Sequence, residues 1–360
     1  MNKAITFRLL TIISILLLVV IYFSPIWWVK LDEVPAYPDG VPINFHINGI
    51  FNGTPVTEGK LCDKLMYWVH EMDVLNYLNG MPINFHINGI FNGSPFTEGE
   101  LCDKLMYWVH KMDVLNYFLG MYPTGTPAPI ERALSPFLFA FLILLLLVFM
   151  ISERRFQATV FTVGFGIIVV WAYVALFTPG GLSLLSKGYQ QFVQCDMDVE
   201  PSEIQKWSGF YAMQESYYAS LSQTTQSRAK NKQMASSMTT TAYVVIEVLI
   251  VGALIFLVGL LWKNNLFYWL LVIIPILLPV FFILEYAGWQ WWINHNLSDW
   301  ASFSYIPPVN INIFGETVVL DGFVIHSYPH YGFGLMMLSS VLLIFAASLR
   351  RKQLRGIEKE

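Results

Sequence analysis

The sequence predicts a membrane all-α bundle of about six transmembrane helices, with a small extracytoplasmic α+β portion that contains a tandem 40-residue repeat. The first observation behind this fold class is composition, because 55% of the 360 residues are hydrophobic and only 13% are charged. The mean hydropathy of +0.52 is too high for an ordinary soluble chain of this length. The second observation is that apolar residues gather in runs of the ~20 residues that a helix needs to cross the hydrocarbon core.

Six apolar runs set the expected order of spans. They lie at about residues 7–29, 133–152, 156–178, 242–262, 266–285 and 333–349. The first run lacks a cleavage site with small residues, so we interpret it as an uncleaved anchor and not as a signal peptide. Pro275 and Pro279 should kink the fifth run.

These runs divide the chain into seven parts. They are a transmembrane anchor (1–29), an outward segment with the repeat (30–132), a transmembrane hairpin (133–178), a second outward segment (179–241), a second transmembrane hairpin (242–285), an outward segment with a β-hairpin (286–332), and a last span with a cytoplasmic tail (333–360).

Basic residues indicate the orientation of the spans. Those at the chain ends and in the short turns are Lys3, Arg8, Arg154, Arg155, Lys263, Arg350, Arg351, Lys352 and Arg355. The positive-inside rule therefore places both termini and both short turns in the cytoplasm. The basic residues between Arg228 and Lys232 depart from this pattern, but they lie in an outward segment of about 60 residues, for which the rule is weaker.

The distribution of reactive side chains indicates where any chemistry takes place. All seven histidines and all three cysteines lie in the predicted outward segments, so we expect that chemistry outside the cytoplasm. The net charge of -4 and the absence of a basic tract argue against nucleic acid as a partner and leave the lipid bilayer. No phosphate-binding loop, dinucleotide fingerprint, nucleophile elbow or haem-attachment motif occurs, so these motifs assign no enzymatic activity and leave the question open.

The first outward segment contains the repeat. Residues 40–79 and 80–119 align without a gap and are identical at 33 of 40 positions, which indicates a recent duplication. Each copy opens with an alternating run that reads PINFHIN in one-letter code and continues into Asn-Gly pairs, a pattern typical of a short strand with turns. The second half of each copy, at about residues 58–78 and 98–118, should be a helix.

One stripe of that helix carries soft metal ligands. Cys62, Met66 and His70 follow one another at a spacing of four residues, which places them on successive turns. The equivalent residues of the second copy are Cys102, Met106 and His110. Thiolate, thioether and imidazole groups suit copper, and the two sulfur ligands favour Cu(I).

Two other interpretations of this stripe are open. Cysteine and methionine also fill hydrophobic cores, so the stripe is equally typical of amphipathic packing. Cys62 and Cys102 could instead form a disulfide between the copies in an oxidising compartment, which would leave Cys195 over and remove the thiolates from the ligand set.

The third outward segment holds further candidate ligands. It should form a β-hairpin that turns at Gly315-Glu316, and the proline between His326 and His330 argues against a helix there. Together with His295, these two histidines could form a shared metal site on the outer face. They could equally be polar residues at the membrane interface.

Three stretches resemble a known family. They read MDVLNYFLGMYP, HNLSDWASF and HSYPHYGFGLMMLSS. With the spacing of the spans, they are similar to a family of bacterial inner-membrane proteins encoded near copper enzymes of nitrogen and one-carbon metabolism, such as nitrous oxide reductase and copper monooxygenases. The resemblance covers most of the chain and implies a multi-pass protein of the bacterial inner membrane with a copper-related role.

The family's short motifs fall on identifiable positions. An Asn-His-Tyr-x-Gly-Met motif falls on Asn76, Tyr77, Leu78, Gly80 and Met81 in the first copy, and on Asn116, Tyr117, Phe118, Gly120 and Met121 in the second. A His-Asn-Leu motif matches His295, Asn296 and Leu297. The family's motif histidine is a tyrosine here, and the family has one copy where this chain has two. Both departures count against a metal site at Met81 or Met121.

These observations predict an integral membrane accessory protein whose extracytoplasmic face binds or hands on copper, or supports the maturation of a copper enzyme. The alternative is a membrane scaffold without metal that docks an extracytoplasmic partner. A transporter would need polar residues through the spans, where Glu247 is nearly alone.

Overall fold

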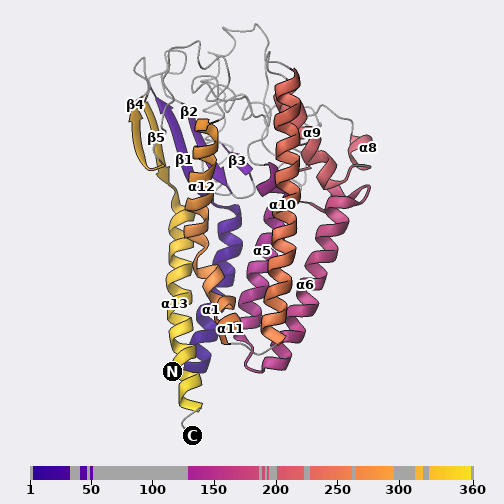
Figure 1. Cartoon of the computed structure of the whole chain (residues 1–360). Helices are drawn as coiled ribbons and strands as arrows, with labels where there is room; N and C mark the ends of the chain where they lie inside the picture. Colours follow the sequence, from indigo (N-terminus) through magenta and orange to yellow (C-terminus); the bar gives the residue numbers. More distant parts are fainter. Residues whose placement is uncertain are drawn as a thin grey trace, which may run out of the picture.

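The computed structural model describes residues 3–32, 41–46, 49–51, 129–185, 189–190, 193, 201–222, 228–261, 265–295, 313–318 and 324–357. This part of the chain is mostly helical, with a small antiparallel sheet at one end of a bundle of long helices (Figure 1). The six candidate ligands of the repeat and the two predicted repeat helices lie outside the described residues.

The elements follow one another along the chain. They are α1 (Lys3–Phe23), β1 (Pro25–Asp32), β2 (Val41–His46), β3 (Gly49–Phe51), α5 (Pro129–Met150), α6 (Arg154–Phe177), η2 (Gly181–Leu184), α8 (Pro201–Ile204), α9 (Gly209–Ser222), α10 (Arg228–Leu261), α11 (Asn265–Ile276), α12 (Leu278–His295), β4 (Gly315–Val318), β5 (Val324–Pro329) and α13 (Tyr331–Ile357).

Five described helices contain segments long and apolar enough to cross a membrane. These segments are Ala4–Phe23, Ala133–Met150, Arg154–Phe177, Thr239–Gly259 and Tyr331–Leu354. The pair Leu266–Ile276 and Leu278–Gly288, bent by 61°, gives a sixth if it is one span. A multi-pass membrane protein with five to six spans is therefore confirmed. Helices α10 and α12 run beyond the predicted spans into the predicted outward segments.

The bend between α11 and α12 has a chemical cause. Pro275 and Pro279 lack the backbone N–H that an interior helical residue donates, so the helix breaks where they cluster. Ser340 of α13 donates its hydroxyl to the carbonyl of Ile276 at 2.8 Å, which satisfies one acceptor at the break. The predicted kink is confirmed.

The two ends of the bundle differ in character. At one end, the sheet begins directly after α1 and returns directly before α13, and α8 and α9 lie at the same level (Figure 1). We call this the sheet end. Both termini and the α5–α6 turn with Arg154 and Arg155 lie at the other end, which we call the basic end.

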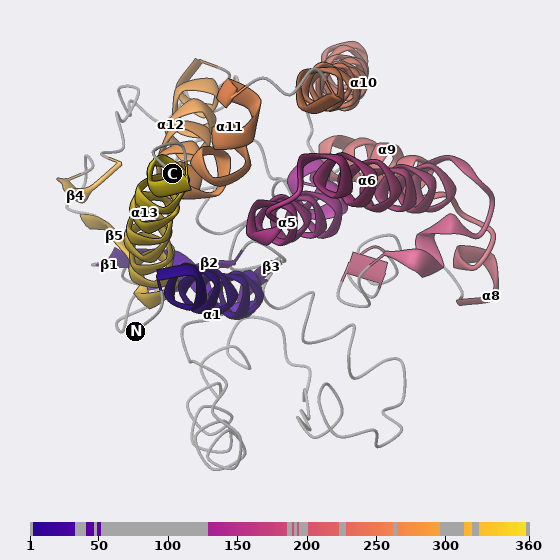
Figure 2. The same ribbon diagram turned by 90° about the horizontal axis from the view of Figure 1, so that it is seen from below.

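The helices pack unevenly around the bundle axis. Helix α1 packs along α13, α5 packs on α6 and α11, and α10 lies at the margin (Figure 2). Large buried side chains from several helices, including Phe7, Phe149, Phe161 and Leu145, form the core. A second, smaller core at the sheet end joins α6 and η2 to α9 and α10.

The sheet joins the two halves of the chain. Its five strands have the order β3-β2-β1-β5-β4, and every pairing is antiparallel. The central pair is β1 with β5, in which Lys30 lies opposite His326. Strands β2 and β3 come from the first copy of the repeat, so the predicted strand there is confirmed.

The predicted end of the first span was wrong. The first span does not reach residue 29, because α1 ends at Phe23 and Pro25–Asp32 form β1. Proline cannot continue the helical hydrogen bonding, and the residues after it, including Trp27 and Trp28, are strand formers that pair on both sides.

The hairpin of the third outward segment exists, but it does not turn at Gly315-Glu316. Gly315 begins β4 with a φ of 108°, and the pairing of Val318 with Val324 makes residues 319–323 the connection. The sequence there contains Asp321-Gly322, which is a stronger turn signal than Gly-Glu.

Candidate functional site

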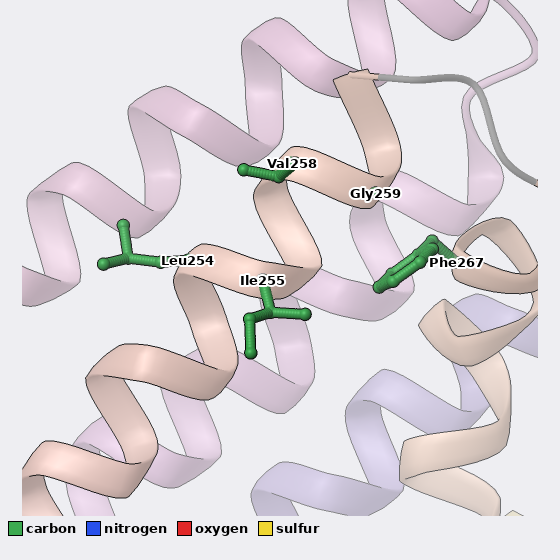
Figure 3. Close-up of a pocket in the computed structure, with 5 residues that line it drawn as sticks. All are labelled: Leu254, Ile255, Val258, Gly259 and Phe267. Carbon is green, nitrogen blue, oxygen red and sulfur yellow. The ribbon is translucent and has the colours of Figure 1, made fainter.

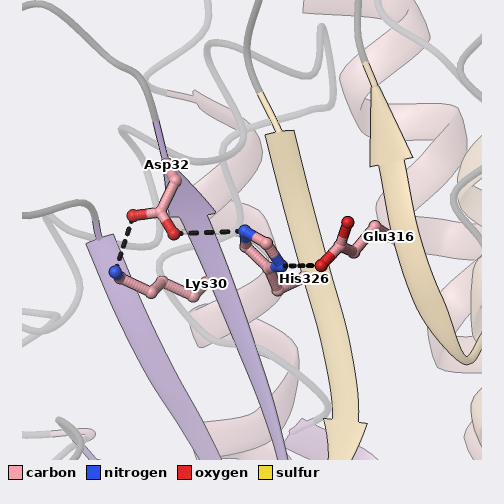
Figure 4. Close-up of polar contacts among 4 residues, drawn as sticks. All are labelled: Lys30, Asp32, Glu316 and His326. Carbon is pink, nitrogen blue, oxygen red and sulfur yellow. Dashed lines mark ion pairs between the residues drawn. The ribbon is translucent and has the colours of Figure 1, made fainter.

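Four charged side chains gather on one face of the sheet (Figure 4). The Nε2 atom of His326 lies 3.2 Å from a carboxylate oxygen of Asp32, and its Nδ1 atom lies 3.2 Å from one of Glu316. Lys30 places its Nζ atom 2.7 Å from the second oxygen of Asp32. We call these four residues the charged quartet.

Strand register builds the quartet. Lys30 on β1 and Glu316 on β4 both lie opposite His326 on β5, so three adjacent strands each contribute a side chain to one row. Asp32 lies two residues beyond Lys30 on the same face of β1. The residues on either side of His326 in β5, Ile325 and Ser327, are buried on the opposite face of the sheet.

Each nitrogen of the His326 ring faces one carboxylate, and Lys30 faces the second oxygen of Asp32. The side chain of His326 is 21% exposed and that of Glu316 is 61% exposed, so water screens the pairs. Each pair therefore contributes at most about 1 kcal/mol to stability.

A hydrogen-bonded hub occupies the opposite face of the sheet. Ser327 donates its hydroxyl to the carbonyl of Ile313 at 2.9 Å, so Trp27 and Tyr286 are the donors to its oxygen, at 2.9 and 3.1 Å. Trp27 also packs against rings from α12 and α13, which are Phe282, Tyr286 and Phe333. The hub holds the sheet against the spans.

His330 has a structural environment at the start of α13. Its Nδ1 atom accepts a hydrogen bond from the backbone N–H of Tyr331 at 2.9 Å, and its own backbone N–H donates to the carbonyl of Ile26. Burial lowers the pKa of His330, which favours the neutral ring that this acceptor role requires. His330 therefore precedes the first residue of α13, accepts its backbone N–H and ties the helix to β1.

The predicted histidine ligands His326 and His330 have different described contacts. His326 contacts carboxylates, whereas His330 contacts backbone, and the described contacts give them no common partner. His295 is the last residue of α12, and its side chain is outside the described part. Across the residues that the structure describes, no group of three or more His, Cys, Asp or Glu could hold a metal ion.

Sequence reasoning missed three members of the quartet. Lys30 and Asp32 were read as the residues just after a helical span, although their alternation beyond Trp28 was a strand signal. Glu316 was assigned to a turn. Only the pairing of β5 with β1 and with β4 shows that these residues meet His326.

The hollows within the spans are apolar. One lies between α10 and α11 and is lined by Leu254, Ile255, Val258, Gly259 and Phe267 (Figure 3). None of these side chains carries a polar atom, so the hollow suits hydrocarbon chains and not a polar substrate. Glu247 lies on an exposed part of α10 further along the same span.

No match to this chain is found among protein-family models, curated proteins or solved structures. What the protein does must therefore follow from its own residues and contacts.

Proposed function

We propose that this chain is an integral membrane accessory protein of the bacterial inner membrane, whose extracytoplasmic face binds copper and hands it on or supports the maturation of a copper enzyme. The observation that supports this most is the pairing of β2 with β1 and of β3 with β2. It places the opening strands of the first copy, Val41–His46 and Gly49–Phe51, in the sheet, and the soft-ligand residues follow in the sequence after Phe51.

The positions of the basic residues support the membrane orientation that this role needs. Arg154, Arg155, Arg350 and Arg351 belong to the basic end, far along the bundle from the sheet (Figure 1). The positive-inside rule assigns such an end to the cytoplasm and the sheet end to the outside, where an extracytoplasmic copper enzyme would be met. The link to copper enzymes themselves comes from the family resemblance.

Reporter fusions test the orientation. We expect a reporter fused after Arg155 to be active only as a cytoplasmic protein, and one fused after Gln223 only as an extracytoplasmic protein, because a full span separates them. Equal expression of both fusions, measured by immunoblot, is the control. Both reporters on the same side would contradict the orientation and the proposed site of copper binding.

Copper binding itself is tested on the purified protein in detergent, titrated anaerobically with Cu(I) against a coloured chelator. The double change Cys62→Ser with Cys102→Ser should abolish stoichiometric binding, because soft thiolates select Cu(I). The double change His70→Ala with His110→Ala should weaken binding without abolishing it. Cys195→Ser is the matched control and should bind as the wild type does.

Each other outcome changes the proposal. Binding that survives in the double cysteine variant would move the site toward His295, His326 and His330. A wild-type protein that binds no Cu(I) with its thiols reduced would favour the scaffold without metal. Loss of binding in Cys195→Ser as well would indicate general damage to the fold.

A further inference from the structure

Three arginines from three helices meet an aromatic cluster at the basic end. The guanidinium carbon of Arg350 lies 4.9 Å from the ring centre of Phe7, and that of Arg154 lies 4.8 Å from the ring centre of Tyr268. Arg8 lies 5.9 Å from the Phe7 ring. We call Arg8, Arg154 and Arg350, with the rings that they contact, the arginine cluster.

Arg350 is the unusual member of the arginine cluster. It is only 2% exposed, although a guanidinium is always charged in proteins. Its Nε–H donates to the hydroxyl of Tyr268 at 2.9 Å and its Nη1–H donates to the side-chain oxygen of Gln353 at 3.1 Å. Both acceptors are neutral, and within the described part of the chain no carboxylate lies within 4.0 Å of Arg350.

A buried cation with neutral partners favours the approach of an anion. Burial of an ion costs several kcal/mol unless an opposite charge compensates it. Two of the five side-chain N–H groups of Arg350 have described acceptors. The other N–H groups can donate to a further acceptor. Tyr268 accepts from Arg350 and keeps its own O–H to donate.

The Tyr268 ring brings the second arginine to the same place. Arg154 lies over its face while Arg350 bonds its hydroxyl, so both guanidinium groups are held on one side chain. Arginine matches phosphate oxygens with paired N–H donors.

The depth of the arginine cluster identifies the kind of phosphate. Arg154 begins the span of α6, and Arg350 lies in the last turns of the span of α13. These are the levels at which lipid headgroups lie, and basic sites between spans at this level suit anionic lipids. We propose that the arginine cluster binds the headgroup phosphate of an anionic phospholipid.

Lipid titration of the purified, delipidated protein in a neutral detergent tests this assignment. Phosphatidylglycerol should raise the temperature of unfolding in a saturable way, whereas phosphatidylcholine should not. Arg154→Gln should weaken the apparent affinity for phosphatidylglycerol about tenfold, which corresponds to about 1.4 kcal/mol. Arg155→Gln, which removes the same charge from the exposed neighbouring position of α6, is the matched control and should change the affinity less than about twofold.

Arg350 is tested with two variants because its burial makes it important for folding as well. Arg350→Gln should abolish the preference for phosphatidylglycerol. Where it fails to accumulate, Arg350→Lys keeps the charge but loses the paired donors, and it should still weaken binding about tenfold or more.

Three results would overturn the proposal. Equal stabilisation by phosphatidylcholine and phosphatidylglycerol would show that headgroup charge is not recognised. Equal effects of Arg154→Gln and Arg155→Gln would show only a general surface potential. Saturable stabilisation by inorganic phosphate alone, at the same concentration as the lipid, would make the ligand a soluble phosphate and not a lipid.

Discussion

Replacing Trp27 with alanine is expected to lower the free energy of unfolding by about 3–5 kcal/mol. Trp27 is 2% exposed and packs against Phe282, Tyr286 and Phe333, so its removal leaves a cavity between the sheet and the spans. The change also removes the indole N–H that donates to the buried hydroxyl of Ser327. Unfolding in detergent, followed by circular dichroism across a denaturant series, measures the loss.

Trp28→Ala is the matched control for this prediction. Trp28 is the next residue of β1, but it lies on the opposite face and stacks on Tyr328, where it is only half-buried. Its loss should therefore cost much less than the loss of Trp27. Similar costs for the two tryptophans would contradict the assignment of Trp27 to the contact between sheet and spans.

Gly332→Ala and Gly334→Ala are expected to change stability in opposite directions. A Cβ atom at Gly332 would lie 2.4 Å from the backbone oxygen of Pro25, so α13 or β1 must move, which costs about 1–3 kcal/mol or more. A Cβ atom at Gly334 meets nothing within 4 Å, and alanine is the better helix former by up to about 1 kcal/mol.

The same unfolding measurement compares the two glycine variants, and each is the control for the other. Both add one methyl group to the same turn of the same helix. A stable Gly332→Ala protein would mean that the close approach of α13 to Pro25 is not needed for the fold.

The membrane-spanning part of this fold could be predicted because its physical requirement is local. About 20 apolar residues and an internally hydrogen-bonded backbone are needed to cross the bilayer, and both can be read from a single run of sequence. The kink at Pro275 and Pro279 is local in the same sense, since proline removes donors wherever it stands.

The sheet could be predicted only in pieces. The alternation of β2 and the hairpin of β4 with β5 are visible in the sequence, but the pairing of β1 with β5 joins residues some 300 positions apart. Trp27 and Trp28 extended an apolar run, so β1 was read as the end of a helix.

In the candidate sites, too, the residue types could be predicted from the sequence but their contacts could not. His326 was identified as a reactive residue type, but its carboxylate partners depend on the strand register. Arg154 and Arg350 were read only as markers of orientation, because burial against Phe7 and Tyr268 is a result of helix packing. Copper binding at the repeat stays a prediction.

The central position of β1 has a consequence for biosynthesis. Its partner β2 follows closely in the chain, but β5, its other partner, lies just before the last span. While the protein is being made, one edge of β1 therefore keeps unpaired backbone donors and acceptors until β5 has been synthesised. The central strand pair, which follows α1 and precedes α13, cannot form before that point.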